Sequence, residues 1–304
     1  MRKIIIDTDI GDDIDDAFAL LMAIARPEDE ILGVTTVFKN TVQRACLAKC
    51  LLTAAGRGDI PVYAGHDRPL RNEIVKWDYE TYGPDGKINV HHFREEMRTA
   101  KIEPGAAEDF ILEMAQRYPG EVTLIAIGPF TNVAKAIQKD AKTFLKLKEA
   151  YVMCGHPSQA YREWNIYVDP EAADILFRSG LPIHCVGLNV TTKCKLYERE
   201  IERVCACSSK AVSLAAQCLN VWLASNNPGG TIVRYPTMHD PLCVLSSQYP
   251  GLCTYEHGRL AVSLKGSTRA QTLCSQNGSP LEIATDVDLE CFYTHFFESL
   301  EMIP

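Results

Sequence analysis

The acidic residues near the start of the chain are the first feature that could do chemistry. Six aspartates fall within ten positions: Asp7, Asp9, Asp12, Asp13, Asp15 and Asp16. Two carboxylates about 5 Å apart repel each other by roughly 3 kcal/mol at an effective dielectric of 20. A helix N-terminus stabilises each carboxylate by only ~0.3–1 kcal/mol. We therefore predict a bound divalent cation, and all-oxygen ligands favour Ca²⁺ or Mg²⁺ over Zn²⁺.

The local pattern separates these aspartates into two groups. An apolar run at 4–6 predicts a short buried strand, and Asp7 and Asp9 follow at its carboxyl end, where open α/β sheets bind their ligands. Gly11 eases the turn, and apolar residues at helical spacing follow it. These positions make Asp7 and Asp9 candidate ligands.

The remaining four aspartates lie where the helix begins. Asp15 and Asp16 precede the apolar helical pattern directly, and we expect both to face the ligand. We expect Asp12 and Asp13 to be a helix cap and first-turn acids, which helix starts favour.

A strand followed by D-x-D also opens phosphatases of the haloacid-dehalogenase type, which use Mg²⁺. Those enzymes have Thr or Val two residues after the second aspartate, and this chain has Gly11 there. The phosphatase hypothesis is therefore the alternative.

Alternating strands and helices must position these residues. Further strands are predicted at 30–37, 60–63, 122–127, 150–154 and 183–186, and helices at 41–55, at 105–117, from 131 and from 170 to about 180. The last third is more helical, with helices at 208–224 and 289–300 and a hairpin plus a short strand at 258–287. This order predicts an α/β fold with a mostly parallel sheet flanked by helices, in one domain over 1–304. Neither a G-x-G-x-x-G motif after a strand nor a P-loop is present.

Residues 71–103 interrupt this rhythm with aromatic and charged residues that follow no clean period, among them Trp77 and Tyr79. A long irregular segment within a compact domain is usually a functional lid or a disordered loop. We expect His91 and His92 to be solvated lid residues rather than a metal pair.

Composition narrows the function further. A net charge of −8 over 304 residues argues against a nucleic-acid or anionic-membrane partner. Because no apolar run approaches the ~20 residues that span a bilayer and no signal peptide is evident, we expect a cytoplasmic protein. The 12 cysteines form no C-x-x-C pair, so we expect most of them, Cys154 included, to be core residues.

Five segments together resemble the nucleoside hydrolase family, which includes inosine–uridine-preferring enzymes and ribonucleoside hydrolases. They are DTDIGDDIDDAFAL (7–20), IGPFTNVAKA (127–136), EWN (163–165), VDPEAA (168–173) and MHDP (238–241). They occur in the family's order and at compatible separations. The resemblance implies an enzyme that cleaves the N-glycosidic bond of nucleosides in nucleoside salvage.

The resemblance also implies a metal site and catalytic roles. One Ca²⁺ would be held by Asp9, Asp16, Asp240 and the backbone carbonyl of Ile127. Asp9 would act as general base, and His239 would protonate the leaving base. On spacing alone, Asp240 could instead be the N-cap of a helix that begins at Pro241.

Four further residues match the family's sugar contacts: Asp15, Asn40, Glu163 and Asn165. Asn40 follows its strand as Asp9 follows the first, but it could equally cap the next helix. Trp164, Tyr161 and Tyr235 are candidates for stacking on the base. By analogy with the family, the protein would be a homodimer or homotetramer.

The chain departs from the family pattern in four places. Two extra residues separate Gly11 from the final aspartate pair, which we align with Asp15 and Asp16, with Asp12 and Asp13 as the alternative. Pro157 replaces a family asparagine, Lys39 replaces a common glycine, and segment 71–103 lacks the family's H-G-x-x-G. These departures leave open a relative that binds nucleoside or Ca²⁺ without turnover.

Overall fold

The structure is a computed structural model that describes residues 1–75 and 80–304. Trp77 and Tyr79, two of the aromatic residues in the expected lid, lie outside the described residues. No helix among the described residues has the length and apolar character needed to cross a membrane.

A nine-stranded sheet runs through the described part of the chain, in the order β3-β2-β1-β4-β5-β6-β9-β7-β8. The strands are β1 (Arg2–Thr8), β2 (Asp29–Thr36), β3 (Val62–Ala64), β4 (Val122–Ala126), β5 (Glu149–Met153), β6 (Ile183–Val186), β7 (Cys253–Val262), β8 (Thr272–Cys274) and β9 (Ser279–Val287). Neighbouring strands are parallel across the first seven positions of this order, from β3 to β9. Strand β7 is antiparallel to both of its neighbours, β9 and β8.

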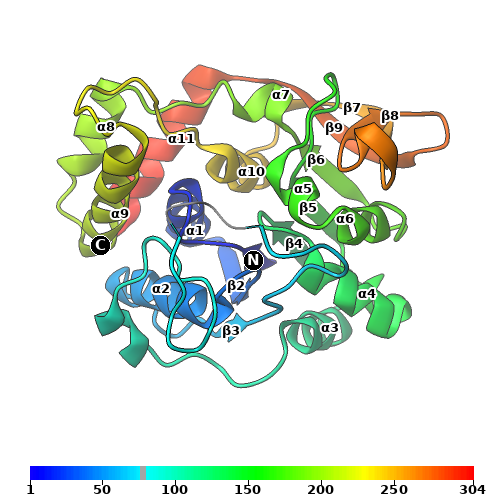
Figure 1. Ribbon diagram of the computed structural model, residues 1–304, viewed down its shortest axis with the longest axis horizontal. Coiled ribbons are helices and arrows are strands. Elements are labelled where there is room, and N and C mark those ends of the chain that lie inside the picture. Colours follow the sequence, from blue (N-terminus) through cyan, green and yellow to red (C-terminus); the bar gives the residue numbers. More distant parts are fainter. Residues whose placement is uncertain (76–79) are drawn as a thin grey trace.

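Helices cover both faces of this sheet (Figure 1). One face carries α1 (Asp15–Ala25), α2 (Thr41–Ala54), α9 (Lys210–Asn226), α10 (His239–Gln248) and α11 (Leu289–Met302), and the other carries α3 (Ala107–Arg117), α4 (Thr131–Phe144) and α6 (Pro170–Phe177). The shorter helices are α5 (Trp164–Val168), α7 (Leu188–Thr191), α8 (Glu198–Cys205) and the 3₁₀ turns η1 (Glu95–Thr99) and η2 (Gly266–Thr268).

The first strand explains this two-layer cover. Ile4 and Ile6 pack into the core on the α1 side, while Ile5 packs into the core on the α3 side. All three are fully buried. A continuous apolar run is what a parallel strand covered on both faces requires. Its burial fixes the place where the chain emerges at Asp7 and Asp9.

The predicted α/β fold with a mostly parallel sheet is confirmed, with small shifts at the ends of elements. The third strand lies at 62–64 rather than 60–63, and the helix expected at 208–224 spans 210–226. The expected hairpin with an extra strand is β7, β8 and β9. Within the described part of segment 71–103, the one helical element is η1.

The expectation that His91 and His92 are both solvated was wrong. His92 is only 3% exposed, and its backbone N–H donates to the carbonyl of Gly11 at 2.8 Å. His91 stacks on His92 with ring centroids 5.3 Å apart. The segment is therefore packed against the acidic turn.

The contact between β2 and α3 gives a stability test at Gly33. A Cβ on Gly33 would lie 2.5 Å from Cζ of Phe110 and 3.2 Å from Cγ of Pro61. We expect Gly33→Ala to lower the free energy of unfolding by about 1–3 kcal/mol, the usual cost of overpacking a core. Urea denaturation would measure this change.

Gly229→Ala is the matched control, because a Cβ there meets no atom within 4 Å. We expect its effect to stay within about 0.5 kcal/mol. Equal stability of the Gly33→Ala protein and the wild type would contradict the packing described here.

Candidate active site

A cavity of about 520 Å³ opens at the carboxyl end of the sheet, lined by residues from at least seven segments. The lining residues are Asp9, Asp12, Asp13, Asp15, Asp16, His91, Ile127, Met153, Tyr161, Glu163, Trp164, Asn165, Leu188, Trp222, Ser225, Asn226, Arg234, His239 and Asp240. Eight of the nine residues to which the resemblance assigned a metal, catalytic or sugar-binding role are in this set. The structure thus brings together side chains up to 231 positions apart (Asp9 to Asp240).

Three carboxylates form the centre of the cavity. Asp15 and Asp16 lie in the first turn of α1, and Asp240 lies in the first turn of α10. One carboxylate oxygen from each lies within 4.8 Å of the others. All three residues are buried, and the backbone N–H of Asp240 donates to Oδ2 of Asp15 at 3.2 Å. The group could hold a metal ion.

The electrostatics of these carboxylates favour a cation. Burial raises the pKa of Asp15, of Asp16 and of Asp240 well above the usual range, and repulsion from neighbouring carboxylates adds to it. Burial also raises the pKa of Asp9 to about 6, although Arg44 opposes the shift. A divalent cation would offset both burial and repulsion. The hard oxygen donors here fit such an ion.

Gly128, which follows β4, lets Asp9 lie close to the chain at the carboxyl end of that strand. A Cβ on Gly128 would lie 2.8 Å from the amide nitrogen of Asp9 and 3.0 Å from its Oδ1. The preceding carbonyl, of Ile127, accepts a hydrogen bond from Nδ2 of Asn165 at 3.0 Å. The same amide donates to the carbonyl of Met153 at 3.1 Å. Asn165 thus ties β4 to β5 and fixes the carbonyl predicted to bind the metal.

Glu163 is held by the backbone around it. Its carboxylate accepts from the amides of Gly155 at 3.0 Å, Asn165 at 2.8 Å and Ile166 at 3.1 Å, and it caps α5. Burial nevertheless raises its pKa to about 7.

Asp7 lies behind the cavity, fully buried in β1. Its Oδ1 accepts from Oγ1 of Thr35 at 2.6 Å and from Nδ2 of Asn132 at 2.7 Å. Within the described residues Oδ2 has no hydrogen-bond partner, and burial raises the pKa of Asp7 to about 7. Asp7 therefore does not line the cavity, and its hydrogen bonds instead join the end of β1 to β2 and α4.

His239 reaches the cavity from the start of α10. Its Nδ1 lies 2.7 Å from Oγ1 of Thr191, which leaves Nε2 as the ring nitrogen that Thr191 does not engage. Burial, with a contribution from Lys195, lowers the pKa of His239 to about 4. The ring is therefore neutral near pH 7.

Asn40 is the one predicted sugar contact that does not line this cavity. Its Oδ1 caps α2 by accepting from the amide of Gln43 at 3.2 Å, and its Nδ2 donates to Oδ2 of Asp85 at 2.9 Å. Its role as a helix cap is thus confirmed. Tyr235, expected near the base, instead donates to the carboxylate of Glu198, whereas Tyr161 and Trp164 do line the cavity.

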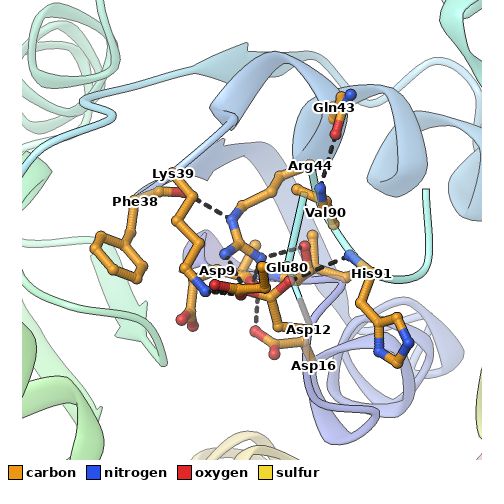
Figure 2. A network of polar contacts seen from close by, with 12 residues as sticks. Asp9, Asp12, Asp16, Phe38, Lys39, Gln43, Arg44, Glu80, Val90 and His91 are labelled. Atoms are coloured by element: carbon orange, nitrogen blue, oxygen red, sulfur yellow. Dashed lines mark hydrogen bonds and ion pairs between the residues drawn. The ribbon is translucent and has the colours of Figure 1, made fainter. Parts of the chain in front are cut away.

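The prediction that Asp12 and Asp13 cap the first helix was wrong. The cap position is occupied by Ile14, which makes no side-chain cap bond. Asp12 forms ion pairs with Lys39 at 3.1 Å and Arg44 at 2.7 Å, and these cations hold its pKa well below the usual range (Figure 2). Asp13 accepts from the amide of Ile14 at 2.7 Å and lines the cavity.

Several residues of the site carried no sequence signal. Trp222 fits the apolar pattern of its helix, yet it lines the cavity beside Arg234 and Asn226. Arg44 is fully buried in α2, and nothing in its spacing marks it as the partner of a turn 32 positions earlier. Helical periodicity identifies buried faces but does not identify which distant charge a buried arginine meets.

Comparison with known proteins agrees with the motifs and the fold. The family model described as inosine-uridine preferring nucleoside hydrolase matches residues 4–294. Uridine nucleosidase 1 of Arabidopsis thaliana is 37% identical, over 95% of this chain and 90% of that protein. The pyrimidine-specific ribonucleoside hydrolase RihA of Shewanella sp. (strain ANA-3) is 33% identical, over 83% and 79%.

Solved structures show the same relationship. A plant nucleoside hydrolase, the PpNRh1 enzyme, superposes with a TM-score of 0.83 at 28% identity, covering 98% of both chains. The purine-preferring ribonucleoside hydrolase from Gardnerella vaginalis gives 0.83 at 25% identity, again over 98% of both.

These matches contradict the phosphatase alternative, because they extend over nearly the whole chain and all concern nucleoside hydrolases. Fold, cavity and relatives agree, and the chain belongs to the inosine–uridine preferring nucleoside hydrolase family of N-glycosidases.

Proposed function

We propose that this enzyme hydrolyses ribonucleosides to free base and ribose in a Ca²⁺-dependent reaction. The single observation that carries the proposal is the buried group of Asp15, Asp16 and Asp240 in the lining of a cavity large enough for a nucleoside. Uridine is the first substrate to test, since the relatives that are 37% and 33% identical are named for uridine and for pyrimidine nucleosides.

The proposed metal ligands are Asp9, Asp16, Asp240 and the carbonyl of Ile127. Ca²⁺ accepts six to eight oxygen ligands in flexible geometry, whereas Mg²⁺ demands a near-ideal octahedron and keeps its waters. A mixed set of carboxylates, a carbonyl and a sugar diol therefore suits Ca²⁺. When bound, the cation would orient the diol and lower the pKa of a water molecule.

Asp9 is the proposed general base. It follows β1 directly, and the absence of a side chain at Gly128 gives its carboxylate room at the β4 edge. Burial raises its pKa to about 6 when no metal is bound, and a bound cation would lower this pKa, so that the carboxylate is ionised and able to accept a proton near neutral pH. Asp9 would take the proton from the attacking water.

The remaining carboxylates would stabilise the sugar as positive charge develops. Cleavage of an N-glycosidic bond passes through an oxocarbenium-like transition state. With the metal bound, Asp15 and Glu163 would place negative charge around the cavity where the ribose would lie, and Asn165 is held in place by its hydrogen bond to the carbonyl of Ile127. A sugar contact by Asn40 would require its Nδ2 to leave Asp85.

His239 is the proposed donor to the leaving base. If Thr191 donates to Nδ1, the neutral ring carries its proton on Nε2 and would donate a hydrogen bond to the departing base nitrogen, which stabilises the negative charge that develops there. Tyr161 and Trp164, at the cavity wall, are the proposed contacts for the base itself.

The decisive experiment measures ribose release from a panel of purine and pyrimidine ribonucleosides. We expect release to stop on chelation and to return with Ca²⁺. Asp9→Asn should lower kcat about 100- to 10,000-fold, because general base catalysis contributes factors of that size. Glu113→Gln, on the exposed side of α3, is the control and should keep wild-type activity. Nucleoside binding without ribose release would instead identify a binding protein without turnover.

The donor role of His239 can be separated from packing by the choice of leaving group. We expect His239→Ala to lower kcat on uridine by about 100-fold or more. A p-nitrophenyl riboside, whose leaving group departs as a stable anion, should be cleaved within about threefold of the wild-type rate. His257→Ala, an exposed histidine on β7, is the control. Equal losses on both substrates would contradict the donor role.

The raised pKa values predict how stability changes with pH when the metal is removed. Asp7 and Glu163 have pKa values of about 7, above those in an unfolded chain, so the folded protein binds more protons between about pH 4 and 7. The free energy of unfolding of the chelated protein should therefore fall as pH rises through that window, by up to about 1.4 kcal/mol per pH unit for each group.

Denaturant unfolding of chelated protein at several pH values measures this slope. The slope should be shallower in Glu163→Gln, which cannot ionise, and added Ca²⁺ should stabilise most at the high-pH end. A flat profile in the chelated wild type would contradict the burial of ionised carboxylates described here.

A further inference from the structure

The connection between β2 and α2 holds an unusual lysine. Phe38 and Lys39 have φ angles of 69° and 58°, a left-handed backbone that glycine adopts freely and other residues adopt with strain. The side chain of Lys39 is nevertheless completely buried. A strained backbone that places a long cation in the interior indicates that the ammonium group has a specific task.

Lys39 joins two carboxylates that come from different segments. Its Nζ lies 3.1 Å from Oδ2 of Asp12 and forms a second ion pair with the carboxylate of Glu80. Both pairs are buried: the Glu80 side chain is 2% exposed and that of Asp12 is 18% exposed. Figure 2 shows the ammonium group between these acids.

Arg44 completes a balanced set of two cations and two carboxylates. Its Nη2 donates to Oδ2 of Asp12 at 2.7 Å, and Nη1 donates to the carbonyl of Ile10 at 2.9 Å and to that of Asp9. Asp12 is therefore fixed by two cations, and one of them also holds the backbone that carries Asp9. Lys39 connects Asp12 and Arg44 to Glu80, because its ammonium group pairs with both Asp12 and Glu80.

Glu80 begins a segment, residues 80–92, that packs on the acidic turn and reaches the cavity. The amide of His91 donates to Oδ1 of Asp12 at 3.3 Å, and the amide of Val90 donates to Oε1 of Gln43 at 2.8 Å. His91 lines the cavity, and its Nε2 lies 3.3 Å from Oγ of Ser225 on α9. The position of segment 80–92 therefore determines the position of His91 in the cavity wall.

We propose that Lys39 is a positioning residue that sets substrate affinity. By bridging Asp12 and Glu80 it holds segment 80–92 against the acidic turn and so keeps His91 at the cavity wall. Lys39 is not among the residues that line the cavity in the described chain, so it acts through these neighbours. The kinetic consequence rests on the proposed function, but the structural one does not.

A double-mutant cycle tests the bridge through kinetics. We expect Lys39→Met to raise KM for the best nucleoside about tenfold or more while kcat changes less than about threefold, because binding geometry is lost and the chemical groups remain. Glu80→Gln, which keeps the side chain's shape, should raise KM in the same way. The two changes share one contact, so the double variant should show much less than the product of the single effects.

Lys87→Met is the matched control, since Lys87 lies on the same segment and its ion pair with Asp67, at 2.9 Å, is more than a third exposed on both sides. Exposed pairs contribute little, and KM should change less than about twofold. KM effects that multiply in the double variant, or a loss confined to kcat, would overturn the positioning role.

Hydrogen exchange tests the same bridge without any activity. In Lys39→Met and Glu80→Gln, the amides of Val90, His91 and His92 should exchange at least about tenfold faster, while the core amides of β1 and β4 keep their wild-type protection. Unchanged exchange at 90–92 would overturn the proposal even if every nucleoside were hydrolysed. Faster exchange there would support it even if none were. Should Lys39→Met not fold, Glu80→Gln and its exchange pattern carry the test alone.

Discussion

The structure depends on confining negative charge at one buried edge of the sheet. Asp15, Asp16 and Asp240 each lie in the interior, with oxygen atoms close enough to repel strongly at low dielectric. Such a group is stable only where each carboxylate is protonated, paired with a cation or shared by a metal ion. The fold pairs Asp12 with cations of its own, whereas the buried group of Asp15, Asp16 and Asp240 could hold a metal ion.

Asp12 illustrates pairing with the protein's own cations. Lys39, in the connection between β2 and α2, and Arg44, in α2, neutralise it, and the arginine also hydrogen-bonds the backbone at Asp9 and Ile10. Within residues 1–75 and 80–304, the three cavity carboxylates form no ion pair with a cation, and they line an open volume instead. This difference, rather than the number of aspartates, separates the structural acid from those available to a metal and a sugar.

The difference also bears on the two additional residues in the acidic turn. Asp15 and Asp16 lie beside Asp240, whereas Asp12 points to Lys39 and Arg44. The geometry therefore favours the alignment that treats Asp15 and Asp16 as the family's final pair. The longer turn adds Asp12 and Asp13, which both line the cavity, and Asp12 is in addition paired with two cations.

How much the sequence could predict depended on the range of the interaction involved. The apolar run at 4–6 and the alternation after it predicted β1, α1 and the parallel sheet, because these patterns reflect local burial. Motif resemblance placed Asp9, Glu163, Asn165 and His239 in one site, and the structure brings all four to one cavity. The path of segment 80–92 could not be predicted, because the segment has no sequence periodicity of its own. Its path is determined by contacts with distant residues.

Lys39 shows why such a residue escapes pattern reasoning. In the sequence Lys39 stands where the family often has glycine, but nothing there marks it as buried, and solvent exposure is the ordinary expectation for a lysine after a strand. Its burial follows from three facts that only the fold supplies: the left-handed backbone at Phe38 and Lys39, the arrival of Glu80, and a turn long enough to bring Asp12 within reach. Because each partner comes from a different segment, the ammonium group joins parts of the chain whose separate sequences carry no sign of one another. A residue of this kind affects the cavity through what it holds in place, and its contribution is measurable only when its partners are changed together with it.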